Sequence, residues 1–549
     1  MKKHITLTFF VFHFLFFISS GFAQSYVFTH DDTLRGSITP ERAWWDVKFY
    51  ALKLKVSPTD STISGSVSVR YKILKPYQIL QIDLQQPLQI ERIVQDGQNL
   101  VFRRERNVFF VDLLKLQKID NQEIIDIYYS GKPRNAKRAP WDGGFSWKTD
   151  RAGNAFVATS CQGLGASVWW PCKDHQSDEP DSMAMSITVP QNLVEVSNGR
   201  LRKITTHTNG THTFDWFVAN PINNYGVNIN IGKYTTWSEV YEGEKGKLDL
   251  TYYALAENVE KAKKHFAEVP RMLKAFEHWF GPYPFYEDGY KLVEVPYLGM
   301  EHQSSVTYGN NYQNGYLGRD LSGTGWGLKW DFIIVHESGH EWFANNITYQ
   351  DIADMWLHES FTNYSESLFT EYYYGKQAGA EYVVGCRKLI RNDKPIVGIY
   401  NVNHQGSGDM YYKGGNMLHT IRQIVNDDDY WRRMLRDLNK TFYHQTVTGK
   451  QIEDFFSGKL GFNMSRFFDQ YLRDIRVPVF EYEIKKDELH YRWSNCVVGF
   501  DMPYKVWLNG QDFRIVFPTT QWKTIKTKKL KTIGTDANYY VDLLETKTK

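Results

Sequence analysis

Two histidines and two glutamates fall within six consecutive positions of the segment VHESGHEWFANNIT (335–348). On a helix, His336 and His340 lie one turn apart and project from the same face. Their imidazoles can therefore bind one zinc ion, at about 2.0–2.1 Å per bond. Glu337 lies between them, facing the place where a metal-bound water would sit. Because a His-Glu-x-x-His pattern arises by chance in roughly a few per cent of chains this long, a solvated polar helix is the alternative.

A catalytic zinc site usually has three protein ligands and one open position, so the motif needs an acid from a second helix. Residues 351–375 predict that helix, with Asp354 able to cap its start. Glu359 lies in its first turns, separated from His340 by eighteen residues, which is enough chain to end one helix and bring the next alongside it. We predict that His336, His340 and Glu359 bind one Zn²⁺ per chain. The residues expected to face inward from the second helix are Met355, Leu357, Phe361, Tyr364 and Leu368.

Three other ionisable residues on these two helices are not needed as ligands. Glu341 and Glu366 are expected to be solvent-facing charges, and His358 is expected to point away from the metal.

The pattern of apolar residues divides the chain into regions. Residues 40–232 alternate with period two, which is typical of strands. The amphipathic segment 256–281 ends at Gly281 and Pro282 and predicts one long helix, and helical patterns continue to about residue 475. Alternation returns from Val477. The sequence therefore predicts a multidomain α+β protein with four parts: a signal peptide (1–23), an N-terminal β domain (24–235), a mainly α zinc catalytic domain (236–476) and a small C-terminal β domain (477–549).

The N-terminus has the pattern of a secretory signal: two lysines, an apolar core over residues 5–18 and a small-residue cleavage site ending at Ala23. An uncleaved membrane anchor is the alternative, but the core is shorter than the roughly 20 residues that span a bilayer. We expect an exported protein, periplasmic or extracellular, with no stable membrane insertion after cleavage.

Composition and charge restrict the partners. With 549 residues, 42% hydrophobic and 16% aromatic, the chain can bury several cores. Its net charge is +3, or +1 once Lys2 and Lys3 are removed, and no basic block suggests nucleic acid or an anionic membrane as partner. The four cysteines could form two disulfides in three pairings or remain buried thiols: Cys161, Cys172, Cys386 and Cys496. The sequence leaves the oligomeric state open.

The metal motif together with Glu359 resembles the zinc aminopeptidase family of aminopeptidase N and leukotriene hydrolase, which are gluzincin metallopeptidases. Other segments resemble the same family in the same order. They are CQGLGASVWWPCKDHQSDEP (161–180), PYLGMEHQS (296–304) and MYYKGGNML (410–418). The resemblance covers roughly residues 45–475. It implies a saddle-like N-terminal β domain, a thermolysin-like catalytic domain and a small C-terminal β-sandwich.

The resemblance implies a zinc-dependent aminopeptidase that releases N-terminal residues from peptides. The zinc would polarise the scissile carbonyl and lower the pKa of its bound water toward about 7. Glu337 would be the general base. Tyr411 matches the family's oxyanion-stabilising tyrosine, although tyrosine is abundant in this chain and Tyr412 is adjacent. Gln162 matches a glutamine that touches the N-terminal end of the substrate.

Recognition of a free N-terminus is implied by the segment around Glu301. This carboxylate would pair with the substrate's α-ammonium, which blocked and internal peptides lack. Without the surrounding motif, the simplest interpretation of Glu301 would be a solvent-exposed surface glutamate. Gly299 and Met300 belong to a segment that resembles the edge strand of the family's cleft, where a glycine allows close approach of an extended peptide.

The sequence departs from the family pattern in places. His302 stands where asparagine is usual, and His358-Glu359-Ser360 replaces Asn-Glu-Gly. Neither change removes a ligand or the base, but both leave the preferred N-terminal residue open. Many relatives continue beyond the small C-terminal β domain into a large helical domain, so we expect a more open cleft here, or closure by a partner subunit.

Two alternatives to the aminopeptidase stay open at this point. One is an epoxide hydrolase of the leukotriene-hydrolase type, which would use the same zinc and Glu301. The other is a catalytically silent peptide-binding protein on the same scaffold, against which the presence of both Glu337 and Tyr411 argues.

Overall fold

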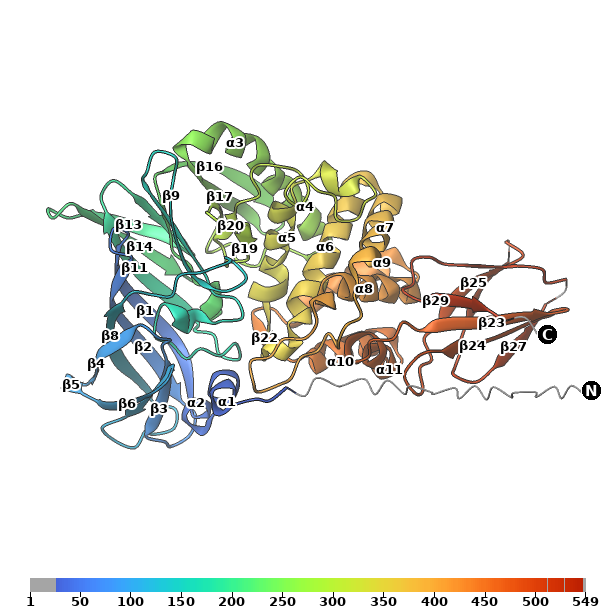
Figure 1. Cartoon of the computed structure of the whole chain (residues 1–549), viewed down its shortest axis with the longest axis horizontal. Coiled ribbons are helices and arrows are strands. Elements are labelled where there is room, and N and C mark those ends of the chain that lie inside the picture. The colour runs from blue at the N-terminus through green and yellow to red at the C-terminus, as the bar shows by residue number, and fades with distance from the viewer. Residues whose placement is uncertain (1–25, 511, 528, 547–549) are drawn as a thin grey trace, which may run out of the picture.

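Three regions follow one another along the long axis of the molecule in Figure 1: a β-rich N-terminal region, a helical centre and a C-terminal β region. The computed structural model describes residues 26–510, 512–527 and 529–546. The predicted signal peptide lies outside them. The predicted α+β fold class is confirmed. All four cysteines are free thiols, and three of them are buried.

The N-terminal region is built on an eight-stranded sheet with the order β13-β14-β11-β1-β2-β8-β4-β5. Its strands are β1 (Trp45–Ser57), β2 (Thr62–Ile73), β4 (Gln89–Gln95), β5 (Gln98–Asn99), β8 (Gln122–Gly131), β11 (Ser182–Pro190), β13 (Arg200–Thr206) and β14 (Thr211–Val218). Leu52 and Leu54 of β1 are buried, whereas Lys53 and Lys55 between and after them are exposed. Alternation of period two therefore buries one face of this sheet, as the sequence predicts.

Two smaller sheets and two short helices complete this region. A four-stranded sheet has the order β12-β15-β10-β9, and a three-stranded sheet has the order β3-β7-β6. The elements are α1 (His30–Gly36), α2 (Pro40–Ala43), β3 (Ile79–Asp83), β6 (Val101–Glu105), β7 (Val108–Asp112), β9 (Gly144–Thr149), β10 (Ala155–Ser160), β12 (Val194–Val196) and β15 (Asn230–Gly232). Most buried apolar side chains of these two sheets join the cluster of the large sheet, whereas Leu34 of α1 forms a separate small cluster with Val108 and Phe110 of β7.

The central region starts with a five-stranded sheet of order β16-β17-β18-β20-β19. Its strands are β16 (Tyr234–Gly243), β17 (Gly246–Leu255), β18 (Tyr290–Glu294), β19 (Gly299–Met300) and β20 (Val306–Tyr308). The short strand β19 is the edge strand, as the family resemblance predicts, and pairs antiparallel with β20 alone.

The single helix predicted over 256–281 is divided in two: α3 (Val259–Phe266) and α4 (Glu268–Phe280). Proline explains the division, because the ring of Pro270 would clash with the carbonyl four residues earlier in a continuous helix. After the break, Pro270 lies in the first turn of α4, where no backbone hydrogen bond is lost. Gly281 ends α4 with a φ of 95°.

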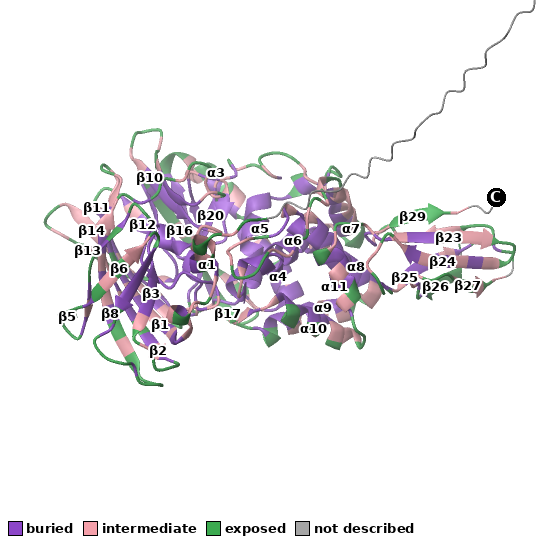
Figure 2. Cartoon of the chain, turned by 60° about the horizontal axis from the view of Figure 1, so that its bottom comes forward, coloured by how far each residue is buried: buried purple, intermediate pink, exposed green. Residues whose placement is uncertain are grey.

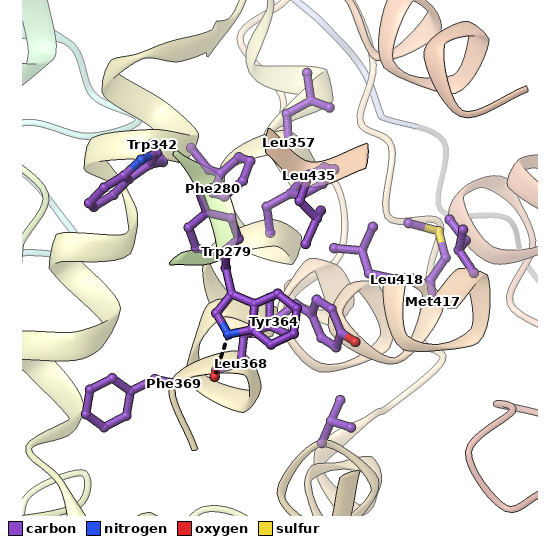
Figure 3. Packing of buried hydrophobic residues seen from close by; sticks show 14 of the residues in the cluster. Trp279, Phe280, Trp342, Leu357, Tyr364, Leu368, Phe369, Met417, Leu418 and Leu435 are labelled. Carbon is purple, nitrogen blue, oxygen red and sulfur yellow. Dashed lines mark hydrogen bonds between the residues drawn. The ribbon is translucent and has the colours of Figure 1, made fainter. Parts of the chain in front are cut away.

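The remaining helices pack into one core beside this sheet. They are α5 (Phe332–Gly339), α6 (Trp356–Tyr374), α7 (Lys376–Gly385), α8 (Tyr412–Val425), α9 (Asp428–Thr441), α10 (Gly449–Leu460) and α11 (Ser465–Phe468). A parallel pair of strands, β21 (Ile347–Tyr349) and β22 (Gln445–Val447), lies among them. Figure 3 shows the packing, in which the Trp279 indole nitrogen of α4 donates to the Leu368 carbonyl of α6 at 3.0 Å.

The C-terminal region contains two sheets, with the orders β27-β24-β23-β29 and β26-β25-β28. Its strands are β23 (Val479–Lys485), β24 (Glu488–Ser494), β25 (Tyr504–Leu508), β26 (Asp512–Val516), β27 (Lys523–Lys526), β28 (Ile533–Thr535) and β29 (Asp542–Glu545). Its apolar core is continuous with that of the helices, and the Tyr471 hydroxyl donates to the Tyr540 carbonyl at 2.8 Å.

Figure 2 shows buried residues both among the N-terminal strands and around α4, α5 and α6 in the centre of the molecule. Across the described ranges, no helix is both long enough and apolar enough to cross a membrane.

Candidate metal centre and peptide-binding site

Helix α5 carries the first two predicted ligands. Asp331 caps its start, accepting from the backbone nitrogens of Ile333 at 3.1 Å and Ile334 at 3.4 Å. Every residue of α5 is buried, so its direction is fixed by packing on all sides. His336 lies in its last turn and His340 at its C-cap.

The structure brings the three predicted ligands together. The imidazoles of His336 and His340 have ring centroids 5.1 Å apart, with planes at 85°. Their Nε2 atoms lie 3.7 and 3.5 Å from Oε2 of Glu359, which comes from the first turn of α6. That oxygen is buried and has no hydrogen-bond donor among the described residues. A buried carboxylate oxygen without a donor is costly unless a cation binds it.

The donor set fits zinc. Two imidazole nitrogens and one carboxylate oxygen are ligands that Zn²⁺ accepts. Atoms bonded to one tetrahedral zinc at about 2.0–2.2 Å lie roughly 3.3–3.6 Å from one another. The ligand atoms of His336, His340 and Glu359 all lie within 4.8 Å of one another, and the two distances to Glu359 are close to the tetrahedral value.

The prediction that Glu366 is a solvated charge is wrong. Its side chain is fully buried, and Oε1 lies 2.7 Å from Nδ1 of His336. Tyr382 donates to its other oxygen at 2.7 Å, and Asn363 donates to Oε1 at 3.1 Å. A carboxylate on the far nitrogen fixes the tautomer and orientation of a ligating histidine. Glu366 follows Glu359 by seven residues, two helical turns, and this spacing could have revealed it.

The partners of Nδ1 of His340 are uncharged, in contrast to the carboxylate that contacts Nδ1 of His336. Its Nδ1 lies 3.0 Å from the Phe343 carbonyl and 3.0 Å from the Thr362 hydroxyl. The carbonyl is available because the chain leaves the helix within the π-turn Glu341–Asn345, where Phe343 and Ala344 have non-helical backbone angles. Both ligating histidines therefore have Nδ1 occupied and Nε2 facing Glu359.

The prediction for Glu341 is also wrong. It is fully buried and accepts from the Ser304 backbone nitrogen at 2.8 Å and the Tyr283 hydroxyl at 3.1 Å. Burial raises the pKa of Glu341 to about 8. Its side chain ties the segment after β19 to the end of α5, so we assign it a structural role.

Glu337 is buried beneath the edge strand. A Cβ placed on Gly299 would lie 2.6 Å from Cγ2 of Ile333 and 3.2 Å from Cγ of Glu337. Glycine at this position therefore lets β19 lie directly against α5. Burial raises the pKa of Glu337 to about 7, with Glu301 adding to the shift and both metal-binding histidines opposing it. A bound cation would lower that pKa.

Glu301 follows β19 and points into the same space. Gln162, from the N-terminal region, donates to Oε1 of Glu301 at 2.5 Å and reaches Oε1 of Glu359 at 3.5 Å. The Tyr225 hydroxyl donates to the same Glu301 oxygen at 3.3 Å. Burial raises the pKa of Glu301, and His340 opposes the shift. Met300, the residue before it, is buried.

Tyr225 was missed from the sequence, where nothing distinguishes it among 35 tyrosines. His358 points away from the metal, as predicted. Its Nε2 accepts from the Tyr349 backbone nitrogen at 3.1 Å, which leaves the proton on Nδ1, 3.5 Å from the Tyr225 hydroxyl. One chain of polar contacts therefore runs from His358 through Tyr225 to Glu301.

Tyr411 lies beside His336 at the metal site. It connects a 3₁₀ turn (Gly408–Met410) to α8, and its half-buried ring stacks on His336 with centroids 6.0 Å apart. Tyr412 is adjacent, with ring centroids 6.3 Å away. Of the two tyrosines, Tyr411 is the one whose ring stacks on a predicted ligand.

Two residues singled out in the sequence lie outside the catalytic groups. Asp354 does not cap α6, which starts at Trp356 without a side-chain cap. It accepts instead from the Tyr400 hydroxyl and the Gly449 backbone nitrogen, both at 2.8 Å. His302 is fully buried, and burial lowers its pKa to about 3, so the ring is neutral. The five residues predicted to face inward from α6 and its preceding turn are all buried.

Two histidines one helical turn apart, a glutamate next to the first of them and a third acidic ligand from the following helix are typical of zinc metallohydrolases. Two family models agree with this arrangement. Residues 265–471 match the peptidase family M1 domain, and residues 47–225 match the peptidase M1 N-terminal domain. The chain belongs to peptidase family M1.

Individual relatives are distant. The chain is 22% identical to probable aminopeptidase 1 of Sulfurisphaera tokodaii over 76% of its own length and 53% of the relative's. It is equally similar to leukotriene A-4 hydrolase of Xenopus laevis, over 76% of this chain and 68% of that one. The chain thus spans about half the length of the archaeal aminopeptidases that it matches.

Among solved structures, the fold is similar to that of the M1 zinc metallopeptidase from Deinococcus radiodurans. The TM-score is 0.65 at 21% identity, over 76% of this chain and 91% of that one.

Proposed function

We propose that this protein is a zinc-dependent aminopeptidase that removes the first residue from peptides with a free N-terminus. The observation that carries the proposal is the unpartnered Glu359 oxygen facing two imidazole nitrogens, with the buried carboxylate of Glu301 beside it. The first arrangement suits a metal ion, and the second suits a cationic amine.

His336, His340 and Glu359 would hold the ion. When bound, zinc supplies Lewis acidity, which polarises a carbonyl and lowers the pKa of a coordinated water. Glu337, buried beneath the strand that would carry the substrate, is placed to take the proton of the attacking water and return it to the leaving amine. Tyr411, stacked on His336, can donate its hydroxyl to the oxyanion that develops on the carbonyl.

Glu301 would explain why cleavage occurs at the N-terminal end of a peptide. Both of its described hydrogen-bond donors, Gln162 and Tyr225, are uncharged, so its negative charge can pair with the α-ammonium of a substrate. The edge strand β19 can bind an extended peptide on the side that β20 does not cover. A peptide held this way has its first carbonyl between Glu301 and Glu337.

A panel of aminoacyl nitroanilides, assayed with and without a chelator, tests the proposal. We expect release of nitroaniline, its loss on chelation and its recovery on addition of zinc. N-acetylated versions should react poorly, because the acetyl group removes the cation that Glu301 binds. No release under any condition would favour a silent peptide-binding protein, and equal cleavage of acetylated substrates would contradict the role of Glu301.

A further inference from the structure

Gln162 links the amine-binding carboxylate to the metal site. Its amide nitrogen donates to Glu301 at 2.5 Å and lies 3.5 Å from Oε1 of Glu359. Gln162 belongs to a short turn that ends at Gly165, whose backbone nitrogen donates to the Cys161 carbonyl at 2.7 Å. The position of this turn therefore sets where the amide of Gln162 lies.

The turn depends on contacts from outside it. Gly163 and Gly165 have positive φ values of 73° and 98°. Because glycine has the widest conformational freedom, a turn that contains two of them is not held in place by its own backbone. Two carbonyls of the turn accept from neighbouring side chains. The Gln85 amide donates to the Leu164 carbonyl at 2.8 Å, and the Asn403 amide donates to the Gly163 carbonyl at 3.1 Å.

A third support is Arg35 of helix α1, which lies directly against the end of the turn. A Cβ placed on Gly165 would lie 2.2 Å from Nη2 of Arg35 and 2.2 Å from Oδ2 of Asp174. The Arg35 guanidinium donates to the Asp174 carbonyl, and its Nη2 lies 3.5 Å from the Asp174 carboxylate. That carboxylate accepts from the Ser167 backbone nitrogen at 3.0 Å and from the Ser167 hydroxyl at 2.5 Å. Arg35 therefore fixes Asp174, which holds the chain directly after the turn.

The next residue of α1 lies against the loop that carries Asn403. A Cβ placed on Gly36 would lie 2.0 Å from the Asn403 backbone nitrogen. Asn403 comes from the central region and holds the Gly163 carbonyl. Helix α1 thus contacts two of the supports of the turn, one through Arg35 and the other through Gly36.

We propose that Arg35 is a positioning residue for substrate recognition: together with Asp174 it holds the turn that places Gln162 against Glu301. Arg35 acts through Gln162 and does not itself bind the peptide. The inference rests on the proposed aminopeptidase function, in which Glu301 binds the substrate's amine.

A double-mutant cycle tests whether Arg35 acts through Gln162. Gln162→Ala removes a donor to a charged acceptor, so KM for aminoacyl nitroanilides should rise about tenfold. Arg35→Ala should raise KM about three- to fivefold, a part of the Gln162 effect, with kcat and zinc content unchanged because no ligand or base is lost. In the double variant, KM should equal that of Gln162→Ala alone, since the side chain that Arg35 positions is no longer present.

Arg106→Ala is the matched control. Arg106 pairs with Asp31 of the same helix, and its side chain is 71% exposed, so KM should stay at the wild-type value. Helix α1 should remain in place in Arg35→Ala, because the Arg42 guanidinium donates to the backbone carbonyls of Arg35 and Ser37 at 3.2 and 2.8 Å.

Gly36→Ala tests the second contact of α1 with a different substitution. The added methyl group would displace the Asn403 backbone and, with it, the amide that holds the Gly163 carbonyl. KM should therefore rise in this variant too, and it should not rise further when Gln162→Ala is already present.

Hydrogen exchange of residues 161–167, measured by mass spectrometry, provides a readout that needs no activity. The segment should exchange faster in Arg35→Ala than in the wild type or in Arg106→Ala, because a support of the turn is lost.

The outcomes separate the two proposals. The positioning role is wrong if exchange or KM in Arg35→Ala stays at the wild-type value, or if the effects of Arg35→Ala and Gln162→Ala add. It is also wrong if kcat or zinc content falls in parallel, as a general loss of structure predicts. If the wild-type protein cleaves no nitroanilide, the aminopeptidase proposal fails, and exchange alone decides whether Arg35 holds the turn.

Discussion

The two halves of the proposed active site are built in different ways. The metal half uses His336, His340 and Glu359, all from two consecutive helices of the central region. The amine half uses Glu301 from the loop after β19 together with Gln162 and Tyr225, which belong to the N-terminal region. One half is local in sequence, whereas the other forms across a contact between regions.

This difference separates metal binding from substrate recognition. The metal half is held by contacts within the helical core, such as the 2.7 Å contact between His336 and Glu366. The amine half depends on the N-terminal region being docked, because both donors to Glu301 come from it. A substitution in the metal half should therefore lower activity through zinc binding. A substitution in the amine half should lower it through substrate recognition, with zinc binding unchanged.

The largest effect is expected at Glu337, which lies where the halves meet. Glu337→Gln keeps the size of the side chain but removes the base, so kcat should fall by about 10²–10⁴-fold. Zinc content should be unchanged, because Glu337 is not one of the three ligands. Steady-state kinetics and metal analysis on the same preparation check both statements, and full activity would refute the assigned role.

Next in size is the loss of charge at Glu301. In Glu301→Gln, kcat/KM for free-amine substrates should fall by about 10–150-fold, equivalent to the 1.5–3 kcal/mol of a charge-assisted hydrogen bond. The already low rate on N-acetylated substrates should barely change, because they carry no ammonium group. A parallel fall for both substrate types would show that Glu301 acts structurally rather than on the amine.

A smaller effect should appear in the metal half alone. In Glu366→Gln the amide oxygen can still accept from His336, but the charge that orients the ring is lost, so zinc affinity should fall by about 10–100-fold. Thr362→Val is the control in the same half. The Phe343 carbonyl still accepts from His340 there, so zinc affinity should change less. Competition with a chromophoric chelator measures both, and equal affinities would contradict the comparison.

The same division explains what the sequence could predict. The metal half follows from helical periodicity, since residues four apart share a face and the next helix brings the third ligand. Glu366 was misjudged because a glutamate in a helix is usually solvated; its spacing of two turns from Glu359 places it on the ligand's face, and the packing of α6 against α5 and α7 encloses it. Glu341 was misjudged for the same reason.

In the amine half, only the residues that match motifs of the family could be predicted from the sequence. Gly299, Glu301 and Gln162 were placed by motif, and the structure brings them together. Tyr225 and its contact with His358 depend on two chain segments that lie 133 positions apart, and no periodicity relates them. The break at Ala267 is a different case, because Pro270 was visible in the sequence and its clash with a continuous helix could have been anticipated.

The smallest effect tests the part of the amine half that the sequence did not reveal. Tyr225→Phe keeps the buried ring and removes only the hydroxyl that donates to Glu301 at 3.3 Å. A neutral hydrogen-bond donor contributes about 1 kcal/mol, so KM for free-amine substrates should rise about fivefold, with kcat and zinc content nearly unchanged. Tyr349→Phe is the matched control, because its buried hydroxyl has no hydrogen-bond partner within the part of the chain that the structure describes, and KM there should stay at the wild-type value. If the Tyr225 variant instead loses zinc, the two halves are coupled through His358 and Glu359, and the separation proposed here is wrong.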